Sequence, residues 1–246
     1  MKLLVCISKA PDTTSKIAFT DNHTRFNEQG VQFIINPYDE WYALVRALEL
    51  KESLGGTVTV INVGKADNEQ IIRKALALGA DDAIRVDLDP ADAYQVAANI
   101  AEHAKGVGYD IILTGKETID YNGGVVGAML AELLDLPYAA LASKLELEGS
   151  NLIIAQELEG LKQTVEVAMP CVISAQKGMA EARIPNMRGI LASKTKPVQV
   201  LVPTHTAVHT AVKTFALPAE KTGCKIIAAE NAAELVQLLH NEAKVI

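Results

Sequence analysis

Residues 113–130, LTGKETIDYNGGVVGAML, combine residue types that bind phosphate with the spacing of a strand that leads into a helix. Gly123 and Gly124 lack a Cβ atom, so the backbone there can adopt positive φ and approach an anion closely. The amides of residues 123–127 would be donors at the positive end of that helix, and Lys116 would add a charge. A strand-to-helix turn often needs glycine for steric reasons alone, however. The pattern therefore leaves a phosphate site and a purely structural turn equally open.

Motifs for other chemistries are absent from the sequence. A P-loop would need glycine five residues before Gly115, where the chain has Asp110, and no GxGxxG, GxSxG or HExxH is present. The five histidines share no motif, and the three cysteines have no CxxC spacing. Cys6, inside an apolar run, is expected to be a small buried side chain. We therefore predict no catalytic residue and no metal site.

The elements that would position the glycine loop follow from short apolar runs that alternate with helix-period segments over the first 140 residues. The expected strands are KLLVCI, TVTVINV, DAIRVDL and YDIILTG, and the expected helices lie at residues 36–52, 66–79 and 90–105 and between the loop and residue 136. Asn36 is expected to cap the first helix, with Pro37 at its first position. In such a parallel sheet, ligands bind at the carboxyl ends of the strands. The loop, VCISKAPD, NVGKAD and NPYD would meet at that edge and could surround an adenosine.

The hydropathy pattern changes from residue 142 onward. There SKLELEG, NLIIAQELEG and KQTVEVAM alternate apolar and polar residues between glycine turns. We expect an antiparallel meander at one edge, then the strand CVISAQ and a helix in the middle of IPNMRGILASKTKP. The nucleotide-binding α/β domain is expected to span residues 1–197. Residues 198–246 would form a C-terminal arm that packs on a partner subunit.

Charge and hydropathy limit the classes of partner. The formal net charge is −7 and the pI is about 5.3, which removes the usual electrostatic basis for binding nucleic acid. No window approaches the ~20 apolar residues that cross a bilayer, so we expect no direct membrane insertion. The cysteine usage favours a reducing compartment, and we expect a cytoplasmic protein. The basic cluster of Arg183, Arg188, Lys194 and Lys196 favours docking of an acidic partner slightly over a solvated face.

Several stretches together resemble one family in their order along the chain. They are NPYDEWYALVRALELKE, IRKALALGADDAIRV, DIILTGKETID, LDLPYAALASKLELEG, and IPNM followed by a basic run. The chain resembles the β subunit of electron transfer flavoproteins along nearly its whole length. The resemblance implies a Rossmann-like three-layer α/β/α sandwich with a mainly parallel sheet, an antiparallel edge meander and a C-terminal arm that embraces the α subunit.

The resemblance also implies cofactors and partners. FAD would lie mainly on the α subunit, and a structural AMP would be buried in this one. Electrons would pass from flavin-dependent dehydrogenases, such as the acyl-CoA dehydrogenases of fatty acid oxidation, through FAD to a quinone oxidoreductase. Carried over by position, the residues around AMP are Cys6, Asn36, Pro37, Tyr38, Asp39, Val63, Gly115, Lys116, Glu117, Thr118, Ile119, Asp120, Tyr121, Asn122, Gly123, Gly124, Val125 and Val126.

A second set of residues corresponds to the family's loop for recognising partner dehydrogenases. An exposed Ile184 among basic residues suits insertion into a hydrophobic pocket of the partner. The set comprises Ile184, Pro185, Asn186, Met187 and Arg188. In the phosphate loop, many members read DDDxNQTG where this chain reads DYNGGVVG. Val125 and Val126 thus replace two side-chain donors, and backbone amides would have to serve instead.

Two other functions stay open. A bifurcating electron transfer flavoprotein would carry a second FAD in the AMP pocket, and GGVVG matches neither type of phosphate loop. A stand-alone adenine-nucleotide sensor or adenylating enzyme could use a similar sheet, although the absence of SGGxDS argues against pyrophosphatase-type chemistry. The number of flavins per heterodimer, and folding with or without an α subunit, would separate the three.

Overall fold

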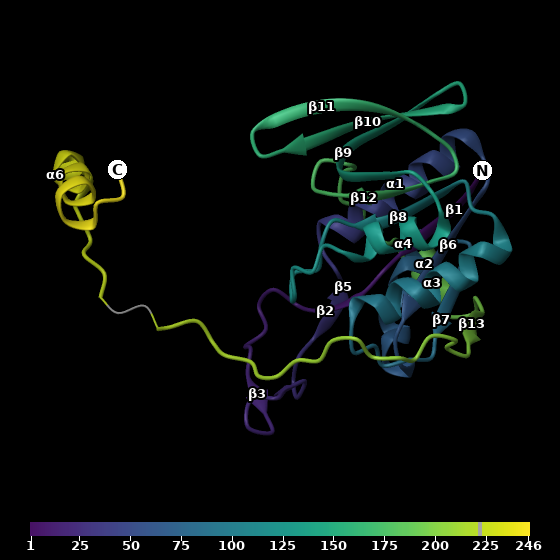
Figure 1. Ribbon diagram of the computed structural model, residues 1–246, viewed down its shortest axis with the longest axis horizontal. Coiled ribbons are helices and arrows are strands. Elements are labelled where there is room, and N and C mark those ends of the chain that lie inside the picture. Colours follow the sequence, from purple (N-terminus) through teal and green to yellow (C-terminus); the bar gives the residue numbers. More distant parts are fainter. Residues whose placement is uncertain (221–222) are drawn as a thin grey trace.

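The fold is organised around one large, mainly parallel sheet (Figure 1). The computed structural model describes residues 1–220 and 223–246. Within these residues the chain builds a nine-stranded sheet of order β11-β10-β9-β12-β8-β1-β6-β7-β13, in which the strands from β9 to β13 run parallel. The strands of this parallel part are β1 (Lys2–Cys6), β6 (Thr57–Val63), β7 (Asp82–Val86), β8 (Ile111–Gly115), β9 (Tyr138–Glu148), β12 (Cys171–Ala175) and β13 (Val198–Leu201).

Helices cover both faces of the sheet. α1 (Asp39–Leu54) and α2 (Glu69–Leu78) pack on one face, and α3 (Ala93–Val107) and α4 (Val126–Leu134) pack on the other. Alternate side chains of a strand therefore enter separate cores, so Leu3 and Val5 face α1 and α2 whereas Leu4 and Cys6 face α3 and α4. These layers confirm the predicted Rossmann-like α/β/α sandwich.

The first long helix begins later than the sequence predicts. α1 starts at Asp39, and its N-cap is Tyr38, which has a φ of 69° and makes no side-chain cap bond. The predictions that Asn36 caps this helix and that Pro37 occupies its first position are therefore wrong. The physical reason is that the Asn36 amide is engaged by the loop after β8, so it is not free to bind the first turn of α1.

The predicted antiparallel meander is confirmed at one edge of the sheet. β10 (Asn151–Leu158) pairs antiparallel with β9 on one side and with β11 (Leu161–Ala168) on the other. Alternate residues of β10 are buried, and Leu152 and Ile154 join the core beneath α1. The β10–β11 ribbon extends past the helical layers in Figure 1.

The long polar stretch after β1 forms two small hairpin-like pairings. β2 (Lys9–Pro11) pairs antiparallel with β5 (Phe33–Ile35), and β3 (Phe19–Thr20) pairs with β4 (Arg25–Phe26). Lys9 lies over the Phe33 ring at 4.1 Å from the ring centroid and also pairs with Asp67 at 2.6 Å. The stretch is thus tied to the start of the second helical segment, which opens with the short 3₁₀ turn Ala66–Asn68.

The C-terminal segment first completes the sheet and then leaves the body. β13 lies just beyond the expected boundary at Pro197 and pairs with β7, so the sheet extends to Leu201. The following arm crosses the body and carries a 3₁₀ turn (Ala229–Asn231), α6 (Ala232–Leu238) and a π turn (Leu239–Ala243), which stand apart from the sheet in Figure 1. None of the helices in the described part of the chain has the length and apolar character needed to cross a membrane.

Helix α5 (Met187–Ser193) provides a test of the packing, because it contacts α2 through backbone at Gly189. A Cβ at this position would lie 2.2 Å from the Ala77 carbonyl oxygen. Gly189→Ala should separate the two helices and lower the free energy of unfolding by about 1–3 kcal/mol, measured by urea denaturation. Leu191→Ala is the control, since Leu191 is 60% exposed on the same helix and should cost less than about 0.5 kcal/mol. Equal losses in the two variants would contradict this packing.

Candidate functional site

The candidate nucleotide site lies where the strand connections change direction. From β1 the chain moves outward to β6 and β7 with α1 and α2 on one face, and it returns to β8 through α3 on the opposite face. Because β1 and β8 are neighbours in the sheet, the segments that follow them diverge at a topological switch point. This is the usual ligand position in open α/β sheets. We call residues 116–125, which follow β8, the switch loop.

Asn36 ties the switch loop to the segment that leads into α1. Its side chain is completely buried. Asn36 Nδ2 donates to the Glu117 carbonyl at 2.8 Å, and Oδ1 accepts from the Ile119 amide at 3.0 Å. Further along the loop, the Asn122 amide donates to the Thr118 carbonyl at 2.9 Å. The loop is thereby held in a defined turn above the end of β8.

Backbone amides at the start of α4 open toward the same edge. α4 begins at Val126, and Val125 before it makes no side-chain cap bond, so the first-turn amides have no partner within the helix. Gly124 has a φ of +56°, a conformation that L side chains rarely adopt. Gly127 closes the GGVVG pattern, and its amide is among the predicted phosphate donors. A Cβ at Gly127 would lie 2.8 Å from Thr114 Oγ1, so this glycine lets α4 approach β8 closely.

Thr114 contributes an unpaired hydroxyl between β8 and the first turn of α4, beside Gly127. Its Oγ1 is buried and has no hydrogen-bond partner among the described residues. A buried hydroxyl without a partner is costly, so a bound polar group would relieve it. Cys6 and Val63 end their strands on the same α3/α4 side of the sheet and form an apolar wall there. Open amides, an unpaired hydroxyl and an apolar wall fit the phosphate and the nucleoside of a mononucleotide.

A buried carboxyl group lies under the other side of the loop. Glu40 is 6% exposed, and its carboxylate accepts from the Ser8 amide at 2.5 Å and from Ser8 Oγ at 2.7 Å. Burial raises the pKa of Glu40 to about 8, against the effect of these two bonds. Gly115 is required here, because a Cβ at that position would lie 2.8 Å from Glu40 Cγ. Glu40 therefore joins the ends of β1 and β8.

The remaining charges near the loop partly compensate one another. Burial raises the pKa of Asp39, because it disfavours the ionised form of the carboxyl group. Lys116 Nζ lies 3.0 Å from the Glu117 carboxylate, and this bond raises the pKa of Lys116. Burial also raises the pKa of the Cys6 thiol far above its ordinary range, so Cys6 is an inert wall residue. The carboxylates near the loop thus repel an anion less than their number implies.

The structure divides the predicted nucleotide residues between two faces. Cys6, Val63, Asn36 and residues 115–126 gather at or near the carboxyl edge. Pro37 and Tyr38 instead line a groove of about 900 Å³ between α1, α2 and α5. Tyr38 is 53% exposed. Exposed loop residues include Ile119, Asp120, Tyr121, Asn122, Gly123, Gly124 and Val125.

The predicted docking residues lie at the other end of that groove. Ile184 is 87% exposed and Met187 is 71% exposed, so both present apolar surface to solvent. Pro185 lines the groove, and the Asn186 side chain caps α5. Arg188 is exposed on the first turn of the helix. These residues form a protruding apolar tip that is held in place by a capped helix.

The basic cluster around this tip is partly engaged in structural contacts. Arg183 donates to both carboxylate oxygens of Glu52, at 2.6 and 3.0 Å. Lys196 Nζ donates to the Ala80 carbonyl. Lys194 lines the groove and is exposed. Arg183 and Lys196 therefore hold the segment in place, while Arg188 and Lys194 are exposed to solvent.

The fold and the site define a doubly wound α/β protein with a glycine-containing loop and open helix amides at its switch point. A family model described as the electron transfer flavoprotein domain matches residues 24–206. The chain is 36% identical over 260 residues to the electron transfer flavoprotein subunit beta of Bacillus subtilis, with both chains covered completely. It is 36% identical over 250 residues to that of Syntrophomonas wolfei, covering 100% of this chain and 98% of the relative. It is 33% identical over 209 residues to that of Homo sapiens, covering 82% of each. The chain therefore belongs to the electron transfer flavoprotein beta-subunit family.

Glu40 gives the fold a defined pH dependence. Its pKa in the folded chain is about 8 and its ordinary value is 4.5, so between these values the folded chain binds more protons than the unfolded chain. Stability should therefore fall as pH rises from about 5 to about 8. Glu40→Gln keeps an acceptor for Ser8 and removes this loss, so the variant should gain more than about 1 kcal/mol over the native chain across that range.

Urea denaturation at several pH values measures this difference. Glu132→Gln, which changes an exposed carboxylate on α4, is the control and should follow the native profile. Parallel pH profiles for the native chain and Glu40→Gln would show that Glu40 does not have the proposed linkage.

Proposed function

We propose that this chain is the AMP-holding subunit of a heterodimeric electron transfer flavoprotein. The α subunit holds most of the FAD, and the heterodimer carries electrons from flavin-dependent dehydrogenases, such as acyl-CoA dehydrogenases, to a quinone oxidoreductase. One observation supports the AMP assignment above the others. The open amides at the start of α4 lie beside the unpaired buried hydroxyl of Thr114 at the switch point.

Each part of the site has a distinct role in holding the nucleotide. The amides of residues 123–127 bind the phosphate, in place of the side-chain donors that Val125 and Val126 cannot supply. Thr114 adds a hydroxyl, and Cys6 and Val63 contact the apolar part of the nucleoside. Asn36 fixes the loop through its bonds to Glu117 and Ile119. AMP has a structural role here, and the FAD of the α subunit supplies the redox chemistry.

The protruding tip at α5 supports docking of a partner dehydrogenase. Ile184 and Met187 offer adjacent apolar surface, and Arg188 and Lys194 add positive charge in a chain of net charge −7. An exposed aliphatic anchor with charged neighbours suits a hydrophobic pocket that has an acidic rim.

Co-purification with the α subunit, followed by extraction of every bound nucleotide, tests the proposal. One FAD and one AMP per heterodimer are expected. Two FAD molecules and no AMP would support a bifurcating protein instead. A chain that folds, stays monomeric and binds an adenine nucleotide would support a sensor. Either of the last two results would overturn the proposed function.

Gly124→Val should remove the nucleotide. The φ of +56° is unfavourable for valine, so the switch loop must rearrange and the amides of residues 123–127 lose their alignment. AMP content of the purified heterodimer, measured by chromatography of the acid extract, should fall at least about ten-fold, which corresponds to 1.4 kcal/mol. Gly108→Val is the matched control: Gly108 has a φ of +69° with open space around it, but lies at the end of α3. Full AMP occupancy in Gly124→Val would refute the assignment.

Ile184→Asp should slow electron transfer from the dehydrogenase without changing cofactor content. A carboxylate cannot replace an apolar anchor in a hydrophobic pocket, so the rate of flavin reduction by an acyl-CoA dehydrogenase should fall at least about ten-fold at subsaturating concentration. Val107→Asp, at the far end of α3, is the control. An unchanged rate in Ile184→Asp, with AMP and FAD both retained, would place docking elsewhere.

A further inference from the structure

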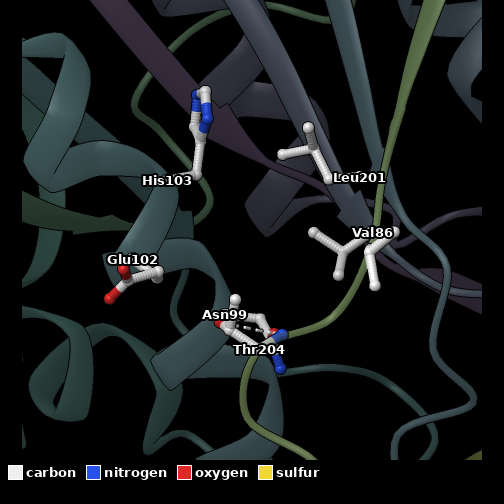
Figure 2. A pocket seen from close by; sticks show the side chains of 7 residues that line it. Val86, Asn99, Glu102, His103, Leu201 and Thr204 are labelled. Atoms are coloured by element: carbon white, nitrogen blue, oxygen red, sulfur yellow. Dashed lines mark hydrogen bonds between the residues drawn. The ribbon is translucent and has the colours of Figure 1, made fainter.

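The root of the C-terminal arm is held by three side chains on one face of α3. We call Asp92, Gln95 and Asn99 the α3 ladder, and residues 204–210 the arm root. The members of the ladder follow one another at intervals of three and four residues, so they share one side of the helix. Gln95 is 2% exposed and Asn99 is 4% exposed. Figure 2 shows Asn99 directed at the arm beside Thr204.

Asn99 uses both ends of its amide on the arm. Oδ1 accepts from the Thr204 amide at 2.9 Å and from the His205 amide at 3.2 Å. Nδ2 donates to the His205 carbonyl at 2.8 Å and to the Gln95 carbonyl at 2.8 Å. One buried side chain thus satisfies three backbone groups of the arm.

Gln95 and Asp92 continue the same pattern toward the start of the helix. Gln95 Nε2 donates to the Thr206 carbonyl at 2.7 Å. Asp92, the N-cap of α3, accepts from the amides of His209 and Thr210 at 2.6 and 3.1 Å through the oxygen that its capping bond leaves free. The contacts are made to the arm's backbone, so they fix its path rather than select its side chains.

Hydrogen bonds make most of the contacts between α3 and this part of the arm, and one ring contact accompanies them: His209 meets Tyr94 of α3 edge to face, with ring centroids 4.7 Å apart. A cavity of about 210 Å³ lies beneath the arm, lined in part by Val86, Leu201 and His103 (Figure 2). The His103 ring forms its hydrogen bond with Tyr109 and not with the arm: Nε2 lies 2.9 Å from the Tyr109 hydroxyl. Loss of the α3 ladder would therefore remove most of the bonds between the arm root and α3 and leave the ring contact between His209 and Tyr94.

A second attachment follows the arm root and fixes the direction in which the arm leaves. The Phe215 amide donates to the His23 carbonyl at 2.7 Å, and the Phe215 and Phe19 rings stack with centroids 4.9 Å apart. In the described residues beyond this point, the hydrogen bonds and the ion pair join arm residues to one another. Leu235 and Val236 of α6 are exposed apolar residues.

We propose that the α3 ladder aims the arm at the partner subunit before the two chains meet, which makes Asp92, Gln95 and Asn99 positioning residues for heterodimer assembly. This inference rests on the proposed function, because the partner is the α subunit of the flavoprotein. A segment whose path is already fixed loses less conformational freedom on binding than a free one. If only a fraction of free chains holds the arm correctly, the apparent affinity falls by that fraction.

Asn99→Leu tests this role in the full chain co-expressed with its α subunit. Leucine has a similar size but removes every bond to Thr204 and His205. Amide hydrogen exchange at residues 204–206 should become faster in the heterodimer, and the subunit dissociation constant should rise about ten-fold or more. Asn99→Asp retains the acceptor for both amides and should give intermediate values. Lys105→Ala, an exposed change on the same helix, should match the native protein.

The outcomes separate the aiming role from simple structural support. If Asn99→Leu prevents folding, Gln95→Leu repeats the measurement at Thr206. Faster exchange at the arm root with an unchanged dissociation constant would overturn the aiming role, as would unchanged exchange. If the native chain does not bind an α subunit at all, the proposed function fails first and the aiming role fails with it.

Discussion

The candidate site depends on the two hydrogen bonds that Asn36 makes to the switch loop. They join the backbone at Glu117 and Ile119 to a side chain that lies 81 and 83 residues earlier in the sequence. The Asn36 side chain is completely buried. A buried amide that loses such partners costs more than the bonds themselves contribute, so the two segments are held together or not at all. The same bonds take Asn36 away from α1, which then starts at Asp39 behind a tyrosine with positive φ. The late helix start and the ordered loop therefore have a single cause.

The parts of the fold that could be predicted depend on local patterns. The apolar runs at β1, β6, β7, β8 and β12 are buried on both faces and short, so each identifies a strand of a parallel sheet without knowledge of its neighbours. The turn at Gly123 and Gly124 can be predicted for the same reason, because it depends on the local succession of a strand, two glycines and a helix. The predicted helix cap at Asn36 is wrong because the same side-chain amide can either cap a helix or bind a distant loop. Its actual partner, Glu117, is 81 residues away and cannot be identified from the local sequence. The unpaired hydroxyl of Thr114 likewise depends on α4 and β8 meeting in space.

The sheet places the two candidate sites on different faces. Cys6, Val63 and Thr114 lie on the α3/α4 side, whereas the groove at Tyr38 and the tip at Ile184 lie on the α1/α2 side. Under the proposed function, the sheet would separate a nucleotide on the first face from a dehydrogenase docked on the second. The segment from Asn36 to Glu40 contacts the switch loop and also borders the groove, so it links the two sites structurally. This separation is consistent with a nucleotide that stabilises the subunit and takes no part in electron transfer.

The arm and the body of the chain are held in place by different interactions. The body is stabilised by apolar cores on both faces of the sheet, and this burial ends at β13. Beyond Leu201 the chain is largely exposed, and its path is fixed mainly by polar side chains of α3 that bind its backbone, with a second attachment where Phe215 stacks on Phe19. Backbone bonds of this kind specify direction but bury little apolar surface, so they cannot hold α6 against the body. Leu235 and Val236 are exposed on α6, so under the proposed function they are the apolar surface that a partner subunit would cover, and a root with a fixed path would present that surface to it.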